Sequence, residues 1–220
     1  VDIVTAHGIK FIGAGPEMIE GMGDKANAKA TMLAAGVPCV PGSEGLLKDG
    51  KHAVEMAKEV GLPVMMKAVA GGGGRGMRVV RKEEEIELLF NEAKGEALRS
   101  FGDGTMFMEK FVDRPKHIEV QILADQDNNA IHLFERDCSI QRRNQKLIEI
   151  APSPQLNEEQ RKYIGDLAVK ASKAVNYQNA GTVEFLLDSE NNFYFITFRN
   201  HNNEKHHIET LAPKNYFSKN

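Results

Sequence analysis

Residues 62–80 read LPVMMKAVAGGGGRGMRVV, and this glycine-centred stretch is the strongest structural signal in the chain. The apolar run over residues 63–69 predicts a buried strand that carries Lys67, and residues 77–80 predict a second strand. Because glycine lacks a Cβ atom, the backbone N–H groups of residues 71–74 can approach and wrap phosphate oxygens. With Lys67 and Arg75 beside it, the loop is predicted to bind phosphate, and a flexible linker is the alternative.

Two familiar phosphate-binding motifs do not match the chain. A Walker A loop needs Lys and then Ser or Thr after its last glycine, whereas residues 75–77 read Arg-Gly-Met. Residues 13–15 read Gly-Ala-Gly, as a dinucleotide-binding fingerprint begins, but the third glycine position is Met18. A turn that follows a strand at residues 9–12 explains these glycines equally well.

The composition is that of a globular protein. Of 220 residues, 41% are hydrophobic and 27% charged, which allows one substantial core or a core and a smaller lobe. The net charge of -3 provides no broad basic field, so we expect no nucleic-acid or membrane partner. Only Cys39 and Cys138 occur, which argues against a disulfide framework and favours a cytoplasmic location. Because the chain begins at Val1 and no strand precedes residues 9–12, we expect a fragment of a longer protein.

Hydrophobic periodicity and capping residues predict a mixed α+β protein. The expected helices cover residues 25–35 with Asp24 as the N-cap, 52–60, 82–99 and 157–175. The expected strands cover residues 38–40, 63–69, 77–80, 106–111, 117–124, 130–135, 181–187 and 193–196. We expect the strands at 106–111, 117–124 and 130–135 to form a meander, and residues 197–220 show no clear period.

Two strands carry polar residues in positions that suggest a site. His117, Glu119 and Gln121 alternate with aliphatic residues and share one face, for which a solvated sheet face is the alternative. Glu184 interrupts an apolar run just before a predicted hairpin that turns near residues 190–191, so it should lie opposite position 197. Position 197 is Thr, where an acid would complete an oxygen cage for Mg²⁺.

The segment 137–146 reads DCSIQRRNQK and concentrates cations and amide donors between two predicted strands. We expect it to be irregular. Such a segment suits a phosphate or a smaller anion, and a solvated basic loop is the alternative.

Five segments together resemble the biotin carboxylase component of acetyl-, propionyl- and pyruvate-carboxylating enzymes. They follow the family's order over about residues 9–196 and read FIGAGPEMIEGMGDK, LPVMMKAVAGGGGRGMRVV, FMEKFVDRPKHIEVQILAD, ERDCSIQRRNQKLIEIAPSP and AGTVEFLLDSENNFYFI. The resemblance implies an α+β ATP-grasp fold, in which two lobes hold ATP and a glycine-rich lid closes over the phosphates. It implies a remnant of a preceding α/β domain at 1–22, an ATP-grasp domain at 23–196 with its small lid lobe at about 40–112, and a divergent tail at 197–220.

The resemblance also assigns roles to individual residues. Lys25 and Lys67 would contact the ATP phosphates, and Lys146 would help bind bicarbonate at the catalytic centre. Glu184 matches the first metal-binding glutamate. The remaining positions implied at the nucleotide are the lid glycines Gly71, Gly72, Gly73 and Gly74, the adenine contacts Glu109, Lys110 and Val112, and Met77, His117, Gln141 and Asn144. The position of Asn144 is His in some relatives.

In the family's reaction, ATP activates bicarbonate as carboxyphosphate, which releases CO₂, and the ureido nitrogen of biotin is carboxylated. The resemblance therefore implies ATP and Mg²⁺ (or Mn²⁺) as cofactors, with biotin and bicarbonate as substrates. It implies a biotin carboxyl carrier domain or protein and a carboxyltransferase as partners, in a homo-oligomeric parent enzyme.

The match ends after residue 196. Where the family reads roughly FIEMNTRIQVEH, residues 195–206 read FITFRNHNNEKH. The second metal glutamate is thus Thr197, the metal asparagine is Arg199, and the arginine and glutamate that act on bicarbonate and biotin are His201 and Lys205. A cation at 199 would oppose metal binding. The hypotheses are a biotin carboxylase, a non-catalytic ATP-binding module, or another ATP-grasp ligase of the carbamoyl-phosphate synthase type.

Overall fold

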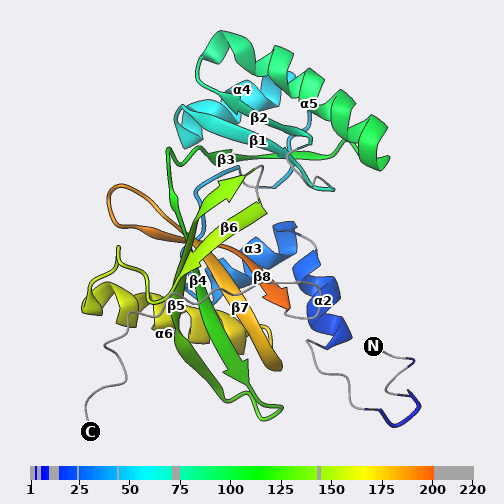
Figure 1. Ribbon diagram of the computed structural model, residues 1–220. Coiled ribbons are helices and arrows are strands. Elements are labelled where there is room, and N and C mark those ends of the chain that lie inside the picture. Colours follow the sequence, from blue (N-terminus) through cyan, green and yellow to red (C-terminus); the bar gives the residue numbers. More distant parts are fainter. Residues whose placement is uncertain are drawn as a thin grey trace, which may run out of the picture. The chain divides into compact units, whose positions relative to one another are not determined.

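The computed structural model describes residues 3, 6–9, 15–23, 25–43, 45–70, 75–142 and 145–200 (Figure 1). The chain forms two compact units. One comprises Val40–Asp113, and the other combines Val1–Cys39 with Arg114–Asn220. Within the described residues, no helix has both the length and the apolar character needed to cross a lipid bilayer.

The unit Val40–Asp113 is a three-stranded antiparallel sheet with helices on one face (Figure 1). The strand order is β2-β1-β3, so β1 is central and pairs with both neighbours. Its elements are α4 (Gly50–Val60), β1 (Val64–Ala68), β2 (Met77–Val80), the short 3-10 helix η1 (Glu83–Glu85), α5 (Ile86–Phe101) and β3 (Met106–Lys110).

Local sequence explains the helices of this unit. Asp49 caps α4, because its side chain accepts a hydrogen bond from the backbone N–H of His52 at 2.9 Å. Helix α5 buries Ile86, Phe90, Ala93 and Ala97, which recur at helical spacing. Leu88 and Leu98 of the same helix are exposed.

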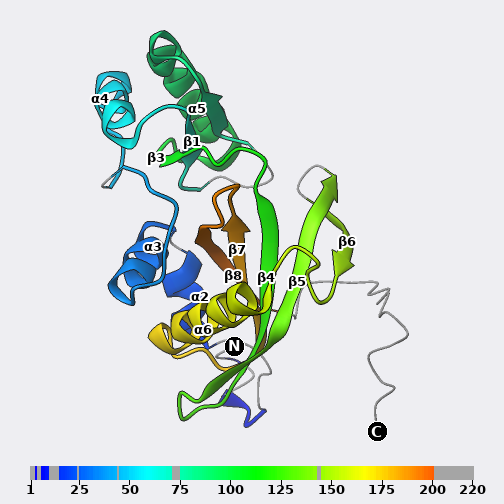
Figure 2. The ribbon, with the colours of Figure 1, turned by 90° about the vertical axis from the view of Figure 1, so that its left-hand side faces the viewer.

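The second unit contains a five-stranded antiparallel sheet in the order β6-β5-β4-β7-β8. Figure 2 shows α2, α3 and α6 together on one side of it. The elements are α2 (Pro16–Gly23), α3 (Lys25–Ala34), β4 (Lys116–Ala124), β5 (Ala130–Arg142), β6 (Gln145–Ile150), α6 (Glu158–Ala174), β7 (Asn179–Leu187) and β8 (Phe193–Asn200).

The two faces of this sheet have opposite characters. Alternate residues of β4, among them Ile118, Val120 and Ile122, pack in an apolar core with helix residues such as Met32 and Ile164. Residues between them in sequence point to the other face. The polar positions of β4 and β7 therefore lie together on the face opposite the core.

Several predicted elements were confirmed, and four need correction. The meander was wrong, because β3 pairs with β1 in the other sheet and only β4 and β5 pair with each other. The expected strand at 38–40 is a single bridge between Cys39 and Phe195. Most of the segment 137–146 is regular: it ends β5 and begins β6, with register shifts that explain its irregular pattern. β8 continues past residue 196 to Asn200, because its backbone pairs with β7 whatever its side chains are.

Candidate functional site

Four strands bring together a set of polar side chains that are far apart in the sequence. We call this set the Glu184 network: His117 and Glu119 from β4, Gln141 from β5, Lys146 from β6 and Glu184 from β7. The register places Glu119 opposite Glu184 and Gln141 opposite Lys146. Adjacent strands present opposite residues on one face, so the five side chains meet there. The solvated-face alternative was wrong for Glu119, which is buried.

Lys146 is the centre of the network. Its Nζ lies 2.9 Å from Oε1 of Glu184 and also donates a hydrogen bond to Oε2 of Glu119. The Lys146 side chain is 7% exposed and both carboxylates are 4% exposed. Burial alone would lower the pKa of Lys146, but the charges of Glu184 and Glu119 outweigh burial and raise this pKa.

The pKa of Glu184 is strongly lowered. Burial would raise it, but the hydrogen bond and charge of His117, followed by Lys146, bring it to about 2. His117 Nε2 lies 3.0 Å from Glu184 Oε2, and Gln141 Nε2 lies 2.7 Å from His117 Nδ1. Gln141 Nε2 also donates to the carbonyl of Cys138 at 2.8 Å. The Gln141 amide therefore fixes the orientation of the imidazole ring that contacts Glu184.

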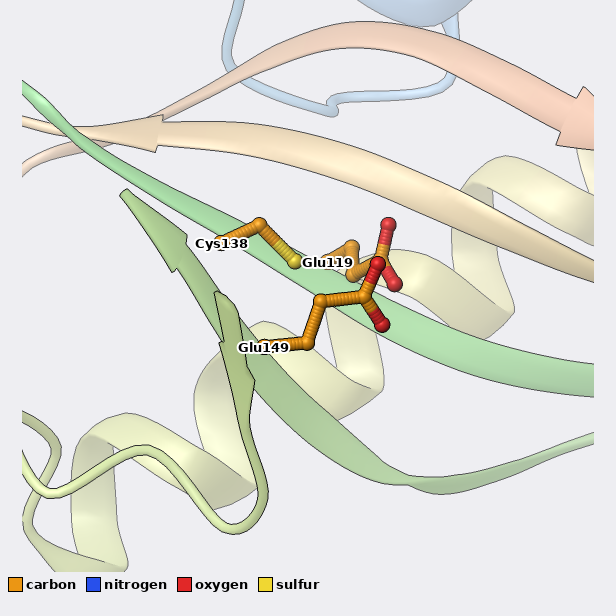
Figure 3. Close-up of side chains that lie close together, drawn as sticks. All are labelled: Glu119, Cys138 and Glu149. Atoms are coloured by element: carbon orange, nitrogen blue, oxygen red, sulfur yellow. The ribbon is translucent and has the colours of Figure 1, made fainter. Parts of the chain in front are cut away.

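Glu119 belongs to a second charged group. Figure 3 shows its carboxylate beside that of Glu149, with the Cys138 sulfur directed toward them; possible ligand atoms of the three lie within 4.8 Å of one another. Arg136 lies 2.6 Å from Glu119 and 3.6 Å from Glu149. Burial, followed by the charge of Glu119, raises the pKa of the Cys138 thiol. Arg136 pairs with both acids, Lys146 also pairs with Glu119, and the thiol remains protonated, so we interpret the group as an ion-pair cluster.

Arg199 approaches Glu184 from β8. Its Nε lies 3.1 Å from Glu184 Oε1. Thr197 pairs directly with Glu184, as the hairpin prediction stated, and Arg199 pairs with Thr182. Residues 197 and 199 share the face of Glu184, so the long Arg199 side chain reaches it diagonally across the ladder.

The unit Val40–Asp113 holds a separate group of predicted residues. Lys67 Nζ lies 2.5 Å from Glu109 Oε2, because β1 and β3 place both side chains on one face. Lys110 instead donates to the carbonyls of Gly61 and Leu62 at 2.8 and 2.9 Å. Met77 pairs with Lys67, and Val112 lies just beyond β3. Lys67 and Glu109 thus meet, whereas Lys110 holds the turn before β1.

The downstream end of the glycine loop is anchored. Gly76 has a φ of +70°, and a Cβ there would lie 2.8 Å from that of Ala68. Its N–H donates to Glu96 at 3.2 Å, and Arg78 donates to the same carboxylate at 2.9 Å. Arg75, which the sequence suggested for phosphate, lies over the ring of Phe101 at 5.2 Å.

Some predicted features lie outside the described residues. They are the strand at 9–12 beyond Ile9, the N-cap Asp24, the glycines 71–74, Asn144 and the tail beyond residue 200. Lys25 lies in α3, and its side chain is not among those described.

Known families provide an independent comparison. The family described as carbamoyl-phosphate synthase L chain, ATP binding domain, matches residues 24–208. The chain belongs to this family. It is 55% identical over 211 residues to a biotin carboxylase of Nostoc sp., covering 96% of this chain and 47% of that protein. It is 57% identical over 189 residues to the 2-oxoglutarate carboxylase small subunit of Hydrogenobacter thermophilus, covering 86% and 40% respectively.

Solved structures share the fold of this ATP-binding domain. A biotin carboxylase from Campylobacter jejuni, in a complex named for β,γ-ATP, has a TM-score of 0.84 at 51% identity, covering 90% of this chain and 45% of that one. The biotin carboxylase domain dimer of the Hydrogenobacter enzyme, with MgADP, ADP and bicarbonate, has a TM-score of 0.82 at 54% identity, covering 90% and 44%. The α+β ATP-grasp prediction and the resemblance to biotin carboxylases are confirmed. The chain spans less than half the length of these relatives.

The magnesium site implied by the resemblance fits these residues poorly. Mg²⁺ takes oxygen ligands at about 2.0–2.1 Å in nearly octahedral geometry. Lys146 and Arg199 both contact Oε1 of Glu184, and His117 contacts Oε2. The paired position on β8 offers the neutral hydroxyl of Thr197 instead of a second carboxylate. The donor set around Glu184 is therefore that of an ion-pair network.

Sequence reasoning assigned no role to Arg136 and did not anticipate that Arg199 contacts Glu184. The alternation in β4 had already placed Glu119 on the site's face. The register pairs Glu119 with Arg136, but this pairing depends on how long hairpin strands align. Once the register is known, a cation paired with a buried acid indicates an ion pair such as that of Arg136 with Glu119.

Proposed function

We propose that this chain is the ATP-binding core of a biotin-dependent carboxylase and acts in the ATP-dependent carboxylation of biotin by bicarbonate. The observation that supports the proposal is the Glu184 network. It gathers His117, Gln141, Lys146 and Glu184, which the resemblance assigns to the nucleotide, bicarbonate and metal, on one face of one sheet. Among these residues, the Lys146 ammonium provides the positive charge for an anionic substrate.

The proposed reaction has three balanced steps. A bicarbonate oxygen attacks the γ-phosphorus of ATP, and ADP leaves with the electrons of the broken P–O bond. The resulting carboxyphosphate breaks its C–O bond and releases CO₂ and phosphate, which keeps the electrons of that bond. The released phosphate takes the proton of the biotin ureido nitrogen, and this nitrogen then bonds to CO₂. The phosphoryl step places negative charge on transferred oxygens, which lysines can stabilise.

The remaining assignments belong to the same proposal. Lys25, Lys67 and the lid glycines 71–74 bind phosphates, and Glu109, Lys110 and Val112 bind adenine, with Met77 and Asn144 nearby. The partners are a biotin carboxyl carrier and a carboxyltransferase in a homo-oligomer; one similar protein was solved as a dimer. The proposed domains are the remnant of a preceding α/β domain at 1–22, the ATP-grasp domain at 23–196 with its small lid lobe at about 40–112, and the divergent tail at 197–220. A cytoplasmic location suits the two buried free cysteines.

The test is ADP release from the chain with ATP and bicarbonate, with and without biotin. Biotin-stimulated release that Lys67→Ala or Lys146→Met abolishes, and Lys162→Met leaves unchanged, is the expected result. Lys162 is a suitable control because it pairs with Asp166 on the exposed surface of α6. Release that depends on ammonia instead of biotin would support a carbamoyl-phosphate synthase type of ligase, and no biotin stimulation would refute the carboxylase.

A second candidate is an ATP-binding module without turnover. The Arg199–Glu184 ion pair and Thr197 favour it, because family members have metal ligands at these two positions of β8. A fluorescent ATP analogue would then bind, and addition of bicarbonate and biotin would release no ADP. Turnover at a rate that Lys67→Ala abolishes would exclude this candidate.

A further inference from the structure

The carboxylate of Glu184 is occupied by nitrogen donors on both oxygens. Oε1 lies 2.9 Å from Lys146 Nζ and 3.1 Å from Arg199 Nε, and Oε2 lies 3.0 Å from His117 Nε2. A divalent cation that bound this carboxylate directly would have to displace one or more of these groups. With a side chain 4% exposed, Glu184 has little room to turn toward another ligand.

Arg199 is a permanent cation, and it comes from β8, whereas Lys146 comes from β6 and His117 from β4. A guanidinium stays charged at any pH at which proteins fold, and it has donors only, so it cannot ligate a metal. Lys146 also pairs with Glu119, and His117 also contacts Gln141, so both have further partners within the Glu184 network. Arg199 is the donor that β8 contributes to this carboxylate.

The residue directly opposite Glu184 provides no second carboxylate for a metal ion. Thr197 pairs with Glu184 across the ladder, and its Oγ1 donates to the carbonyl of Phe198 at 3.2 Å. A hydroxyl adds no negative charge, so Glu184 is the acid at this point of the β7–β8 ladder. A carboxylate whose charge is already paired with Lys146 and Arg199 offers a divalent cation little electrostatic attraction.

We propose that Arg199 is a built-in cation that replaces the metal ion at Glu184, so that this chain binds its nucleotide without a divalent cation at that carboxylate. Arg199 is then the residue that determines whether a divalent cation binds at Glu184. The metal part of the proposal concerns this chain's own residues alone. The nucleotide part rests on the proposed function, so the two are tested separately.

Mn²⁺ is the probe for the metal part, because the electron paramagnetic resonance signal of the free ion measures binding without nucleotide or activity. The full chain and its Glu184→Gln variant should bind Mn²⁺ equally weakly, within twofold. The double variant Thr197→Glu/Arg199→Asn should bind at least tenfold more tightly, and adding Glu184→Gln should remove that gain.

Three further variants control for charge and folding. Arg199→Lys keeps the cation and should behave like the unaltered chain, whereas Arg199→Asn alone should fall between the chain and the double variant. Arg99→Asn removes one positive charge from the exposed last turn of α5 and should change nothing. Circular dichroism would establish that each variant is folded.

The proposal is overturned if Glu184→Gln weakens Mn²⁺ binding tenfold in the otherwise unaltered chain. It is also overturned if the folded variants Arg199→Asn and Thr197→Glu/Arg199→Asn, which have no cation at position 199, bind Mn²⁺ no more tightly than the unaltered chain. A fluorescent ATP analogue tests the nucleotide part: the unaltered chain should bind it at least as well in EDTA as in Mg²⁺, and the double variant should prefer Mg²⁺. An unaltered chain that needs Mg²⁺ overturns this part, whereas no binding in either buffer refutes the proposed function and leaves the Mn²⁺ result standing.

Discussion

Replacing Lys146 with Met should destabilise the unit that carries the five-stranded sheet by about 3 kcal/mol. The side chain is 7% exposed and lies between the carboxylates of Glu119 and Glu184, each 4% exposed. Removing one partner of a buried ion pair costs about 3–5 kcal/mol, because the other charge stays buried. The lower end applies here, since Arg136 still contacts Glu119 and Arg199 still contacts Glu184. Methionine fills a similar volume, which keeps the cavity contribution small.

Urea unfolding followed by tyrosine fluorescence measures this loss. The chain has 4 tyrosines and no tryptophan, and all the tyrosines follow residue 114, so the signal reports the unit that contains Lys146. With a slope of about 2–3 kcal/mol per M, the urea midpoint should fall by about 1 M. Lys162→Met is the matched control, because it removes an exposed ion pair with Asp166 and should cost less than about 0.5 kcal/mol.

The pH dependence gives a second measure of the same network. The folded pKa of Glu184, at about 2, is below its ordinary value of 4.5, so its contribution is fully present above pH 4.5 and is lost as the pH falls toward 2. That difference corresponds to on the order of 3 kcal/mol at about 1.36 kcal/mol per pKa unit. Lys146→Met should flatten the decline between pH 4.5 and 2. The reasoning would be refuted if Lys146→Met lowered the free energy of unfolding by less than about 1 kcal/mol at neutral pH and left its decline between pH 4.5 and 2 unchanged.

Three substitutions elsewhere test local features, each by thermal or urea unfolding. Asn157→Ala removes the capping box of α6 and should lower the free energy of unfolding by about 1 kcal/mol; an unchanged value would contradict the cap. Phe134→Gly should raise it by about 0.5–1 kcal/mol, because this exposed residue has a φ of 63°, whereas the control Leu133→Gly should lower it. Gly165→Ala should lower the free energy of unfolding by about 1–3 kcal/mol, because the added Cβ would lie 2.5 Å from the His132 ring. Adding His132→Ala should relieve this loss, and a double variant whose loss equals the sum of the two single losses would count against the contact.

Local sequence was sufficient for most elements. The capped helices α4 and α6, the strands on both sides of the glycine loop and the β7–β8 hairpin could be predicted, because caps and periodic burial depend on nearby residues. Even the pairing of Glu184 with Thr197 followed from the length of one hairpin. The resemblance added the ATP-grasp fold, which the similar structures confirm.

What the sequence alone could not determine is which strands pair at long range. β3 looked like the first strand of a meander, yet it completes the small sheet beside β1. The Glu184 network depends on β4 pairing with β7, and the Arg136 contact depends on the alignment of β4 with β5. Strand pairing buries similar backbone groups in many arrangements, and only packing of the whole core selects one. For the same reason, the contact of Arg199 with Glu184 became visible only in the folded sheet.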